Sequence, residues 1–305
     1  MFSKILIPLD GSDGAAGAIA PARTIAKATG ASIQLLNVHD GPTSTEVTLH
    51  LAQVAAELTA IGIAVETSTR TGSPATEIIA EAVASGADVI AMATHGRSGL
   101  SRAFLGSVAE SVLGASPVPV LLFRPDGHNV RSIGTVLVPV DGSPGGTLAL
   151  ASAVALARSV SARVVLLQVV VPVLAYTAMD VGIYGGGLWF DPAWDEESLA
   201  SAKRYVDGMA TRLVQSGVRA EGIALMGGAL TPSMSVAETI IAAADKSEAD
   251  LIVMSTHAHT GAARVFLGSV ADALVRHSHR PVLMVRRGGA AEEAANTEQA
   301  ARATA

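Results

Sequence analysis

One stretch of the sequence carries the residue types that bind phosphate groups. The glycine-rich segment 94–99 (THGRSG) is followed by Gly106-Ser107-Val108, which opens a stretch with helical periodicity. Glycine lets the backbone approach an anion and adopt positive φ, and a helix start presents free N–H groups and the positive end of the helix dipole. The Ser107 hydroxyl and the Arg97 guanidinium are further donors. The pattern indicates a phosphate site, and an ordinary loop before a capped helix is the alternative.

A carboxylate occurs earlier in the chain, where the first apolar run ends. Asp10 follows residues 5–9, and Ser12 or Asp13 is placed to cap the next helix. Asp10 is either part of this turn or a group that points into a crevice beyond the strand. Duplication within the chain would preserve it in both cases, as Asp141.

The chain repeats these features once. Residues 4–12 (KILIPLDGS) recur as 135–143 (TVLVPVDGS), and residues 104–110 (FLGSVAE) recur as 266–272 (FLGSVAD). A repeat this long is a duplicated domain and not a solenoid unit.

We therefore predict two domains, 1–127 and 132–287. The second copy is longer, with an insertion near 172–197 that holds both tryptophans, Trp189 and Trp194. The insertion is either a lid, a partner-binding loop or a cover for its own domain. Residues 288–305 lack large apolar side chains and are predicted to be a disordered tail.

Composition narrows the class of protein. Half of the 305 residues are hydrophobic but only 3% are aromatic, as in parallel sheets covered by alanine-rich helices. The chain has no cysteine, which excludes disulfides, thiolate metal sites and thiol nucleophiles. The net charge of −6 offers nucleic acid no electrostatic attraction. No signal peptide or membrane span is recognisable, so we expect a cytoplasmic protein.

Strands and helices alternate along each copy. Nearly continuous apolar runs predict strands that are buried on both faces, over 5–9, 32–38, 63–69, 87–93 and 118–123, and again near 135–140, 162–170, 218–225, 249–255 and 281–285. Helices are predicted over 14–29, 45–61, 74–85 and 106–115, and Pro21 predicts a kink or a late start in the first of them. The fold class is α/β, with two tandem five-stranded, mainly parallel sheets and helices on both faces. Ligands of such sheets bind beyond the carboxyl ends of the strands.

These motifs resemble those of the universal stress protein family, over nearly the whole chain except the tail and the insertion. The family's nucleotide motif is Gly-x2-Gly-x9-Gly-Ser/Thr after the fourth strand. It matches Gly96 and, after nine intervening residues, Gly106-Ser107, with Ala93 at the first glycine position. The resemblance implies an adenine-nucleotide α-hydrolase-like sandwich that binds ATP, ADP or AMP. Mg²⁺ would be carried mainly by the phosphates, because the sequence offers no carboxylate cage.

The resemblance also implies which residues of the first copy bind the nucleotide. Residues near the first two strand ends would line the adenine and ribose, and the later ones would border the ribose and hold phosphate oxygens. The set is Pro8, Asp10, Val38, Met92, Ala93, Gly96, Arg97, Gly106, Ser107 and Val108.

The second copy departs from the motif at both early glycines. Ser255 stands at the first position and Ala258 at the second, so we expect a site that is weak or empty. Its remaining candidates are Pro139, Asp141, Val169, Met254, Ser255, Gly268, Ser269 and Val270.

Function follows from the resemblance as an expectation with alternatives. We expect an ATP-binding protein of the stress response that acts through nucleotide-dependent conformation and contacts with unknown protein partners, with little or no turnover and no dedicated metal site. A nucleotide-free interaction module and a slow ATPase, with His95 as base, are the alternatives. The last strands of the two copies can pair within the chain, forming an intramolecular pseudo-dimer. A homodimer through other surfaces is also possible.

Overall fold

The computed structural model describes residues 2–41, 44–94, 105–125, 127, 130–142, 148–172, 192–227, 235–256 and 268–286. In the first half the strands are β1 (Lys4–Pro8), β2 (Ser32–His39), β3 (Val65–Thr71), β4 (Val89–Ala93) and β5 (Val120–Phe123). Its helices are α1 (Asp13–Ala16), α2 (Ile19–Thr29), α3 (Thr45–Ala60), α4 (Pro74–Ser85) and α5 (Ser107–Ala115).

The second half repeats the alternation of strands and helices. Its strands are β6 (Thr135–Pro139), β7 (Arg163–Val170), β8 (Ala220–Met226), β9 (Leu251–Thr256) and β10 (Val282–Arg286). Its helices are α6 (Leu148–Val160), α8 (Pro192–Gln215), α9 (Val236–Lys246) and α10 (Ser269–His277). Residues 173–191 of the predicted insertion and the predicted tail lie outside the described residues, and residues 192–197 begin α8.

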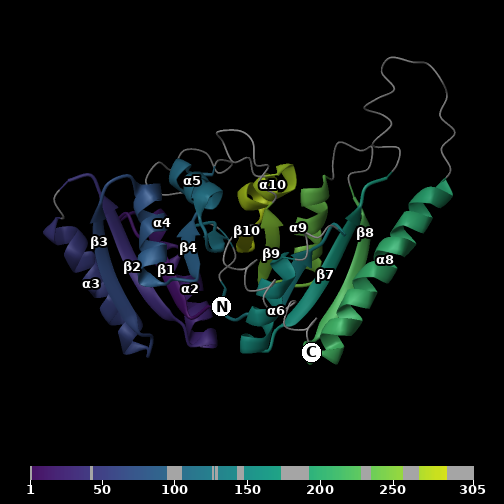
Figure 1. The fold of residues 1–305 in the computed structure, drawn as a ribbon, viewed down its shortest axis with the longest axis horizontal. Helices are drawn as coiled ribbons and strands as arrows, with labels where there is room; N and C mark the ends of the chain where they lie inside the picture. The colour runs from purple at the N-terminus through teal and green to yellow at the C-terminus, as the bar shows by residue number, and fades with distance from the viewer. Residues whose placement is uncertain are drawn as a thin grey trace, which may run out of the picture.

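All ten strands form one sheet in the order β3-β2-β1-β4-β5-β10-β9-β6-β7-β8 (Figure 1). Neighbouring strands within each half are parallel, which confirms the predicted fold class. The two halves meet where β5 and β10 pair antiparallel, with Leu121 opposite Leu283. Each last strand therefore covers the edge of the other, and the two expected sheets are continuous.

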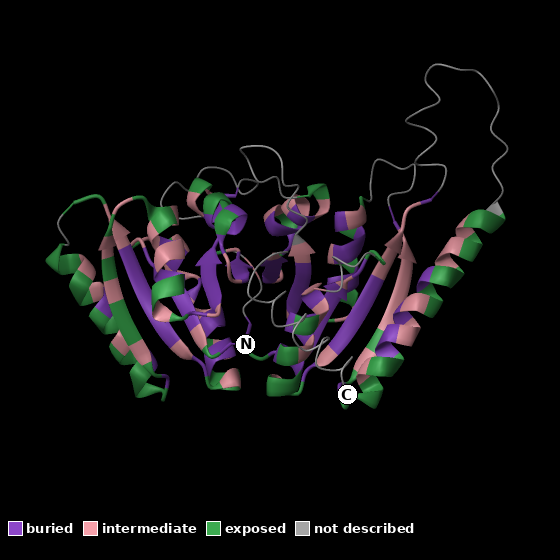
Figure 2. Ribbon diagram, viewed as in Figure 1, coloured by how far each residue is buried: buried purple, intermediate pink, exposed green. Residues whose placement is uncertain are grey.

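Helices cover both faces of the sheet, so its central strands are buried on two sides. Ile5 and Ile7 of β1 pack into one core while Leu6 between them packs into the other. Figure 2 shows the central strands buried and the outward sides of α3 and α8 exposed. This burial on both faces explains why the central strands are continuous apolar runs. The edge strands β3 and β8 differ from the prediction, because they are only partly buried and β3 is mostly polar.

The first predicted helix is interrupted, as Pro21 indicated. The chain forms α1 and then α2, and Pro21 lies in the first turn of α2, where its missing N–H has no intrahelical acceptor to lose. Ser12 caps α1 by accepting a hydrogen bond from the N–H of Ala15 at 3.2 Å. Gly30 ends α2 with φ 75°, in the left-handed region that favours glycine.

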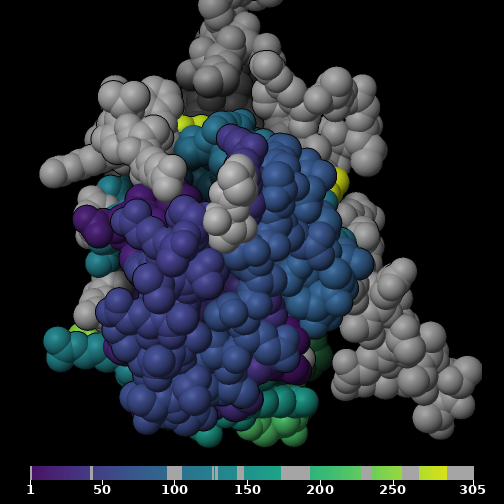
Figure 3. Space-filling view, turned by 90° about the vertical axis from the view of Figure 1, so that its left-hand side faces the viewer, coloured from purple at the N-terminus to yellow at the C-terminus, as the bar shows by residue number. Residues whose placement is uncertain are grey.

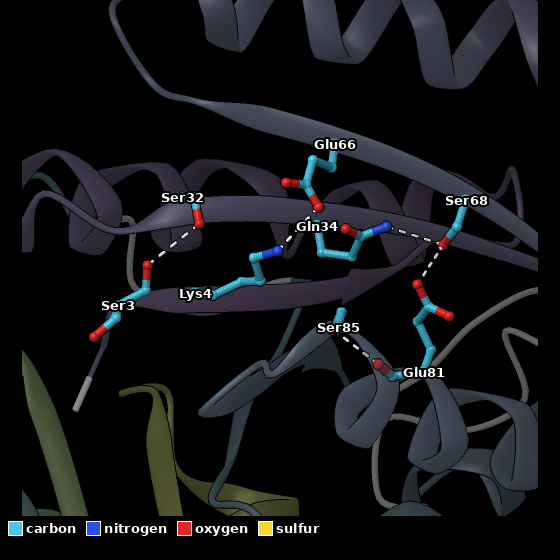
Figure 4. A network of polar contacts seen from close by, with 8 residues as sticks. All are labelled: Ser3, Lys4, Ser32, Gln34, Glu66, Ser68, Glu81 and Ser85. Atoms are coloured by element: carbon cyan, nitrogen blue, oxygen red, sulfur yellow. Dashed lines mark hydrogen bonds and ion pairs between the residues drawn. The ribbon is translucent and has the colours of Figure 1, made fainter.

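A polar network fastens α4 to the outer strands of the first half (Figure 4). The Gln34 amide donates to the Ser68 hydroxyl at 3.0 Å, and Ser68 donates to the Glu81 carboxylate at 2.8 Å. Arg70 of β3 donates to the other Glu81 oxygen at 2.5 Å, and this hydrogen bond raises the pKa of the guanidinium. Viewed from the outer edge, residues of the first half, coloured purple to blue, form most of the near surface (Figure 3).

In the part of the chain that the structure describes, no helix combines the length and the apolar character needed to cross a membrane.

Candidate functional site

A cavity of about 460 Å³ lies at the carboxyl ends of β1, β2 and β4, beside the start of α5. Its volume falls within the roughly 300–1,000 Å³ typical of small-molecule sites. Residues from six separate segments of the first half line it, and those at the strand ends meet there because parallel strands end at the same edge of the sheet. Those predicted from the sequence are Pro8, Asp10, Val38, Met92, Ala93, Gly106, Ser107 and Val108. The other two, Gly96 and Arg97, lie outside the described residues.

Two hydrogen bonds fix the end of β4, one to the start of α5 and one to β5. The N–H of Gly106 donates to the carbonyl of Thr94 at 2.8 Å, although ten or more residues separate them in the chain. The N–H of Thr94 in turn donates to the carbonyl of Phe123, also at 2.8 Å. The strand end is therefore fixed to its neighbour β5 and to the helix, and Met92 and Ala93 share a wall with Ser107.

The start of α5 has the geometry of an anion site. Gly106 is the N-cap residue, with φ −62° and ψ 144°, and no side chain caps the helix. The first N–H groups of a helix have no intrahelical acceptor, so those of Ser107 and Val108 are available to a ligand. The φ of Gly106 is negative, so the backbone conformation does not require glycine here. Glycine contributes to the site by leaving the space that a side chain would fill. Our expectation that positive φ requires glycine does not hold at this position.

Asp10 is held in a tight turn at the end of β1. Its Oδ1 accepts hydrogen bonds from the Ser12 N–H at 3.0 Å and from the Ser12 hydroxyl at 2.6 Å. Gly11 between them has φ 81°, which favours glycine. The turn therefore uses one carboxylate oxygen and orients Asp10, which lines the cavity. The structural and ligand-contacting interpretations of Asp10 are compatible.

Several lining residues were not predicted from the sequence. Asn37, His39 and Asp40 come from the end of β2, and Pro74 and Ile78 come from the first turns of α4. Asn37 donates from Nδ2 to the carbonyl of Leu9 at 2.7 Å, and its Oδ1 is buried without a hydrogen-bond partner among the described residues. The signal that could have found His39 and Asp40 is their position at the end of a strand. No local signal pointed to α4, because only tertiary packing brings it to this edge.

The second half reproduces part of this arrangement. Gly268 starts α10 with φ −57° and ψ 149°, again without a side-chain cap, and Ser269 and Val270 open the helix. Gly142 has φ 78°, like Gly11. The remaining candidates follow or end strands: Pro139 ends β6, Asp141 follows it, Val169 lies in β7, and Met254 and Ser255 lie in β9.

The two halves differ at the end of their second strands. Where β2 ends in Asn37-Val38-His39, β7 ends in Gln168-Val169-Val170. The second half thus has no imidazole at this position. Ala258, which the sequence analysis singled out, lies outside the described residues.

Charged groups of the described residues show no preformed metal centre. No cluster of three or more His, Asp or Glu side chains is found within the described ranges.

Comparison with known proteins identifies the family. The model of the universal stress protein family matches residues 1–124 and again residues 132–286. The chain belongs to the universal stress protein family. Two similar proteins are a universal stress protein from Thermus aquaticus, aligned over 137 residues, and one from Bacillus subtilis, aligned over 148. Each is 32% identical to this chain in sequence. Each alignment covers the whole of the relative and 41% of this chain.

Solved structures of similar length share the fold. A universal stress protein from Archaeoglobus fulgidus superposes with a TM-score of 0.65 at 22% identity, covering 94% of this chain and all of that one. A Pseudomonas aeruginosa protein, described as a candidate universal stress protein, gives a TM-score of 0.66 at 20% identity and covers 93% of both chains. At these identities the likeness establishes the fold, in which two universal stress protein units follow one another in a chain.

Proposed function

We propose that the first half of this universal stress protein binds an adenine nucleotide, ATP or its products, in the cavity at the carboxyl ends of β1, β2 and β4. The observation that carries the proposal is the convergence of eight motif residues on one cavity beside an uncapped helix start. A nucleotide has an apolar base, a hydroxyl-bearing ribose and a charged phosphate chain. The cavity supplies a matching group for each.

The phosphates would lie against the start of α5. The N–H groups of Ser107 and Val108 and the Ser107 hydroxyl donate to phosphate oxygens, and the helix dipole favours their negative charge. In the part of the chain that the structure describes, no side chain caps this helix start. Arg97 is proposed as a further phosphate partner by its place in the motif.

The base and ribose would lie toward β1 and β2. Val38, Ile78 and Met92 line the cavity with apolar surface against which a purine can pack. Asp10 lines the cavity at a strand end, and a carboxylate in this position accepts hydrogen bonds from ribose hydroxyls. Pro8 shapes the same wall.

We further propose that the protein binds nucleotide with little turnover and responds to stress through nucleotide-dependent contacts with other proteins. When bound, Mg²⁺ would neutralise phosphate charge without a protein cage. The second half, which differs at β7 and at the glycine positions, would bind more weakly.

Isothermal titration of nucleotide-stripped protein with Mg-ATP tests the proposal. One site per chain supports a functional first half and a degenerate second half, whereas two sites would overturn the proposed difference between them. No heat, together with an unchanged melting temperature, would overturn nucleotide binding and favour an interaction module. Release of phosphate at a rate of about 1 s⁻¹ or faster, the lower end for typical enzymes, would overturn the proposal of little turnover.

A further inference from the structure

A second cavity, of about 800 Å³, lies at the opposite edge of the sheet from the nucleotide cavity. Its walls come from the second half of α2, the segment 130–133 between the halves, and residues 159–161 at the end of α6. These segments precede β2, β6 and β7, so the groove faces the amino ends of those strands. Figure 1 shows α2 and α6 side by side at the bottom of the molecule, where the halves meet. We call this cavity the interdomain groove.

The groove gathers positive charge without a compensating acid. Arg23, Lys27 and Arg131 line it and all three are exposed, and among the described residues no acidic side chain is part of its lining. None of the three forms an ion pair with a described residue. Arg23 and Lys27 are four positions apart on α2, a spacing at which like charges destabilise a helix. In a chain of net charge −6, such a cluster is not explained by composition.

The segment 130–133 between the halves is anchored to α2, which keeps Arg131 beside that helix. Thr24 of α2 donates a hydrogen bond from its hydroxyl to the carbonyl of Val130 at 2.8 Å. Val130 and Ile133 are buried, at 3% and 5% exposure, and they enclose the exposed pair Arg131-Ser132. The backbone of Arg131 is therefore fixed before any ligand arrives, which lowers the entropy lost on binding.

The wall from α6 adds polar and apolar surface. Ser161 has φ 54°, a left-handed conformation that is unfavourable for a non-glycine residue. The first half has Gly30 at the matching position, two residues before its second strand. Serine places a hydroxyl on the groove wall where glycine would be more stable. Ile61, 40% exposed, contributes an apolar patch to the same groove.

We propose that the interdomain groove binds a small polyanion that carries two or more phosphate groups. The three cationic side chains of the groove can neutralise the negative charges of two or more phosphate groups. The guanidinium groups of the two arginines can each donate two hydrogen bonds to one phosphate, and the lysine ammonium acts as a point charge. The volume exceeds that of the nucleotide cavity, and Ile61 offers a surface for an organic body. Because the groove contacts both halves and the segment between them, a ligand there stabilises their junction. This inference does not depend on the proposed nucleotide binding.

Titration of the full chain with inorganic tripolyphosphate and with fructose 1,6-bisphosphate tests the proposal. The groove variant is Arg23→Gln/Lys27→Gln/Arg131→Gln, since glutamine preserves helix propensity and removes charge. The charge-matched control is Arg204→Gln/Arg212→Gln/Lys246→Gln, which changes three exposed cations of the second half. The third variant, Gly106→Val, obstructs the nucleotide cavity. Melting temperatures without ligand verify that each variant folds.

We expect both the wild type and the control triple variant to bind, and affinity to fall about tenfold or more in the groove variant. Gly106→Val should retain this binding. Three results would overturn the proposal: no binding by the wild type, unchanged affinity in the groove variant, or a loss of affinity in Gly106→Val alone. The last of these would place the anion in the nucleotide cavity. Tighter binding of tripolyphosphate indicates an inorganic polyphosphate ligand, and tighter binding of the bisphosphate indicates an organic one. If the groove variant does not fold, Arg131→Gln alone, which changes one exposed side chain, replaces it.

Discussion

Valine in place of Gly106 is expected to remove phosphate binding without disturbing the fold. The φ of −62° and ψ of 144° at this residue lie in a region that valine adopts readily, so the substitution introduces no backbone strain. The new side chain would project at the start of α5, beside the N–H groups of Ser107 and Val108. The expected effect is therefore steric exclusion of the phosphate from these donors.

The magnitude follows from the donors that are lost. A hydrogen bond to a charged group contributes about 1.5–3 kcal/mol, and the helix dipole, which valine leaves in place, contributes about 0.3–1 kcal/mol. Displacing the phosphate from one such donor weakens binding about ten- to 150-fold. Losing both donors would bring affinity close to the detection limit of titration.

The second half provides a matched control. Gly268 has nearly the same backbone angles, also starts an uncapped helix, and has open space at the position of a Cβ atom. Gly268→Val therefore carries the same intrinsic cost of valine at a helix start, about 1 kcal/mol of stability. Titration with Mg-ATP and thermal melting should show similar melting temperatures and a loss of affinity in Gly106→Val alone. Equal losses in both variants, or none in Gly106→Val, would refute the steric argument.

Three further predictions concern other parts of the structure. Asp10→Ala should lower affinity for Mg-ATP at least about tenfold; Asp10→Asn, which keeps an acceptor for Ser12, should recover the melting temperature but not the affinity, and recovery of both would show that the charge is not used. Glu81→Gln should lower the free energy of unfolding in urea by about 1–3 kcal/mol, because Arg70 loses a charged acceptor. Since the pKa of Arg70 is raised, its guanidinium stays charged and this loss should be the same at pH 6 and pH 8. A loss confined to one of these pH values would contradict the pairing of Arg70 with Glu81. Leu283→Ala, at a fully buried position opposite β5, should cost about 2–5 kcal/mol by the same measurement, and a cost below about 1 kcal/mol would argue against the β5–β10 junction.

Much of the site was predictable because its signals are local in the sequence. The turn at Asp10 depends on Gly11 and Ser12, which are adjacent, and the start of α5 depends on Gly106 and the residues after it. Pro21 likewise predicted the break between α1 and α2 from its own covalent geometry. Such features follow from residue type and short-range hydrogen bonds, and the structure reproduces them.

The residues that escaped prediction contribute through contacts with distant segments. Asn37 is a polar residue in a largely apolar strand, and its role appears only when its amide donates to the carbonyl of Leu9, just after β1. Pro74 and Ile78 reach the cavity because the hydrogen bonds from Gln34 to Ser68 and from Ser68 to Glu81 hold α4 against β2 and β3. Sequence spacing carries no information about such contacts, because chain distance and spatial distance are unrelated across parallel strands.

The sequence by itself determined the duplication, the alternation of strands and helices, and the motif residues, because periodicity and repeats are properties of the chain. Tertiary structure alone decided how the halves join. Pairing of β5 with β10 makes one sheet from two, and the hydrogen bond from Thr24 to Val130 brings Arg131 to the cations of α2. These contacts join segments more than 100 residues apart, as is the case for Thr24 and Val130 with a separation of 106. Their free energy arises from burial and hydrogen bonding that exist only once the chain has folded.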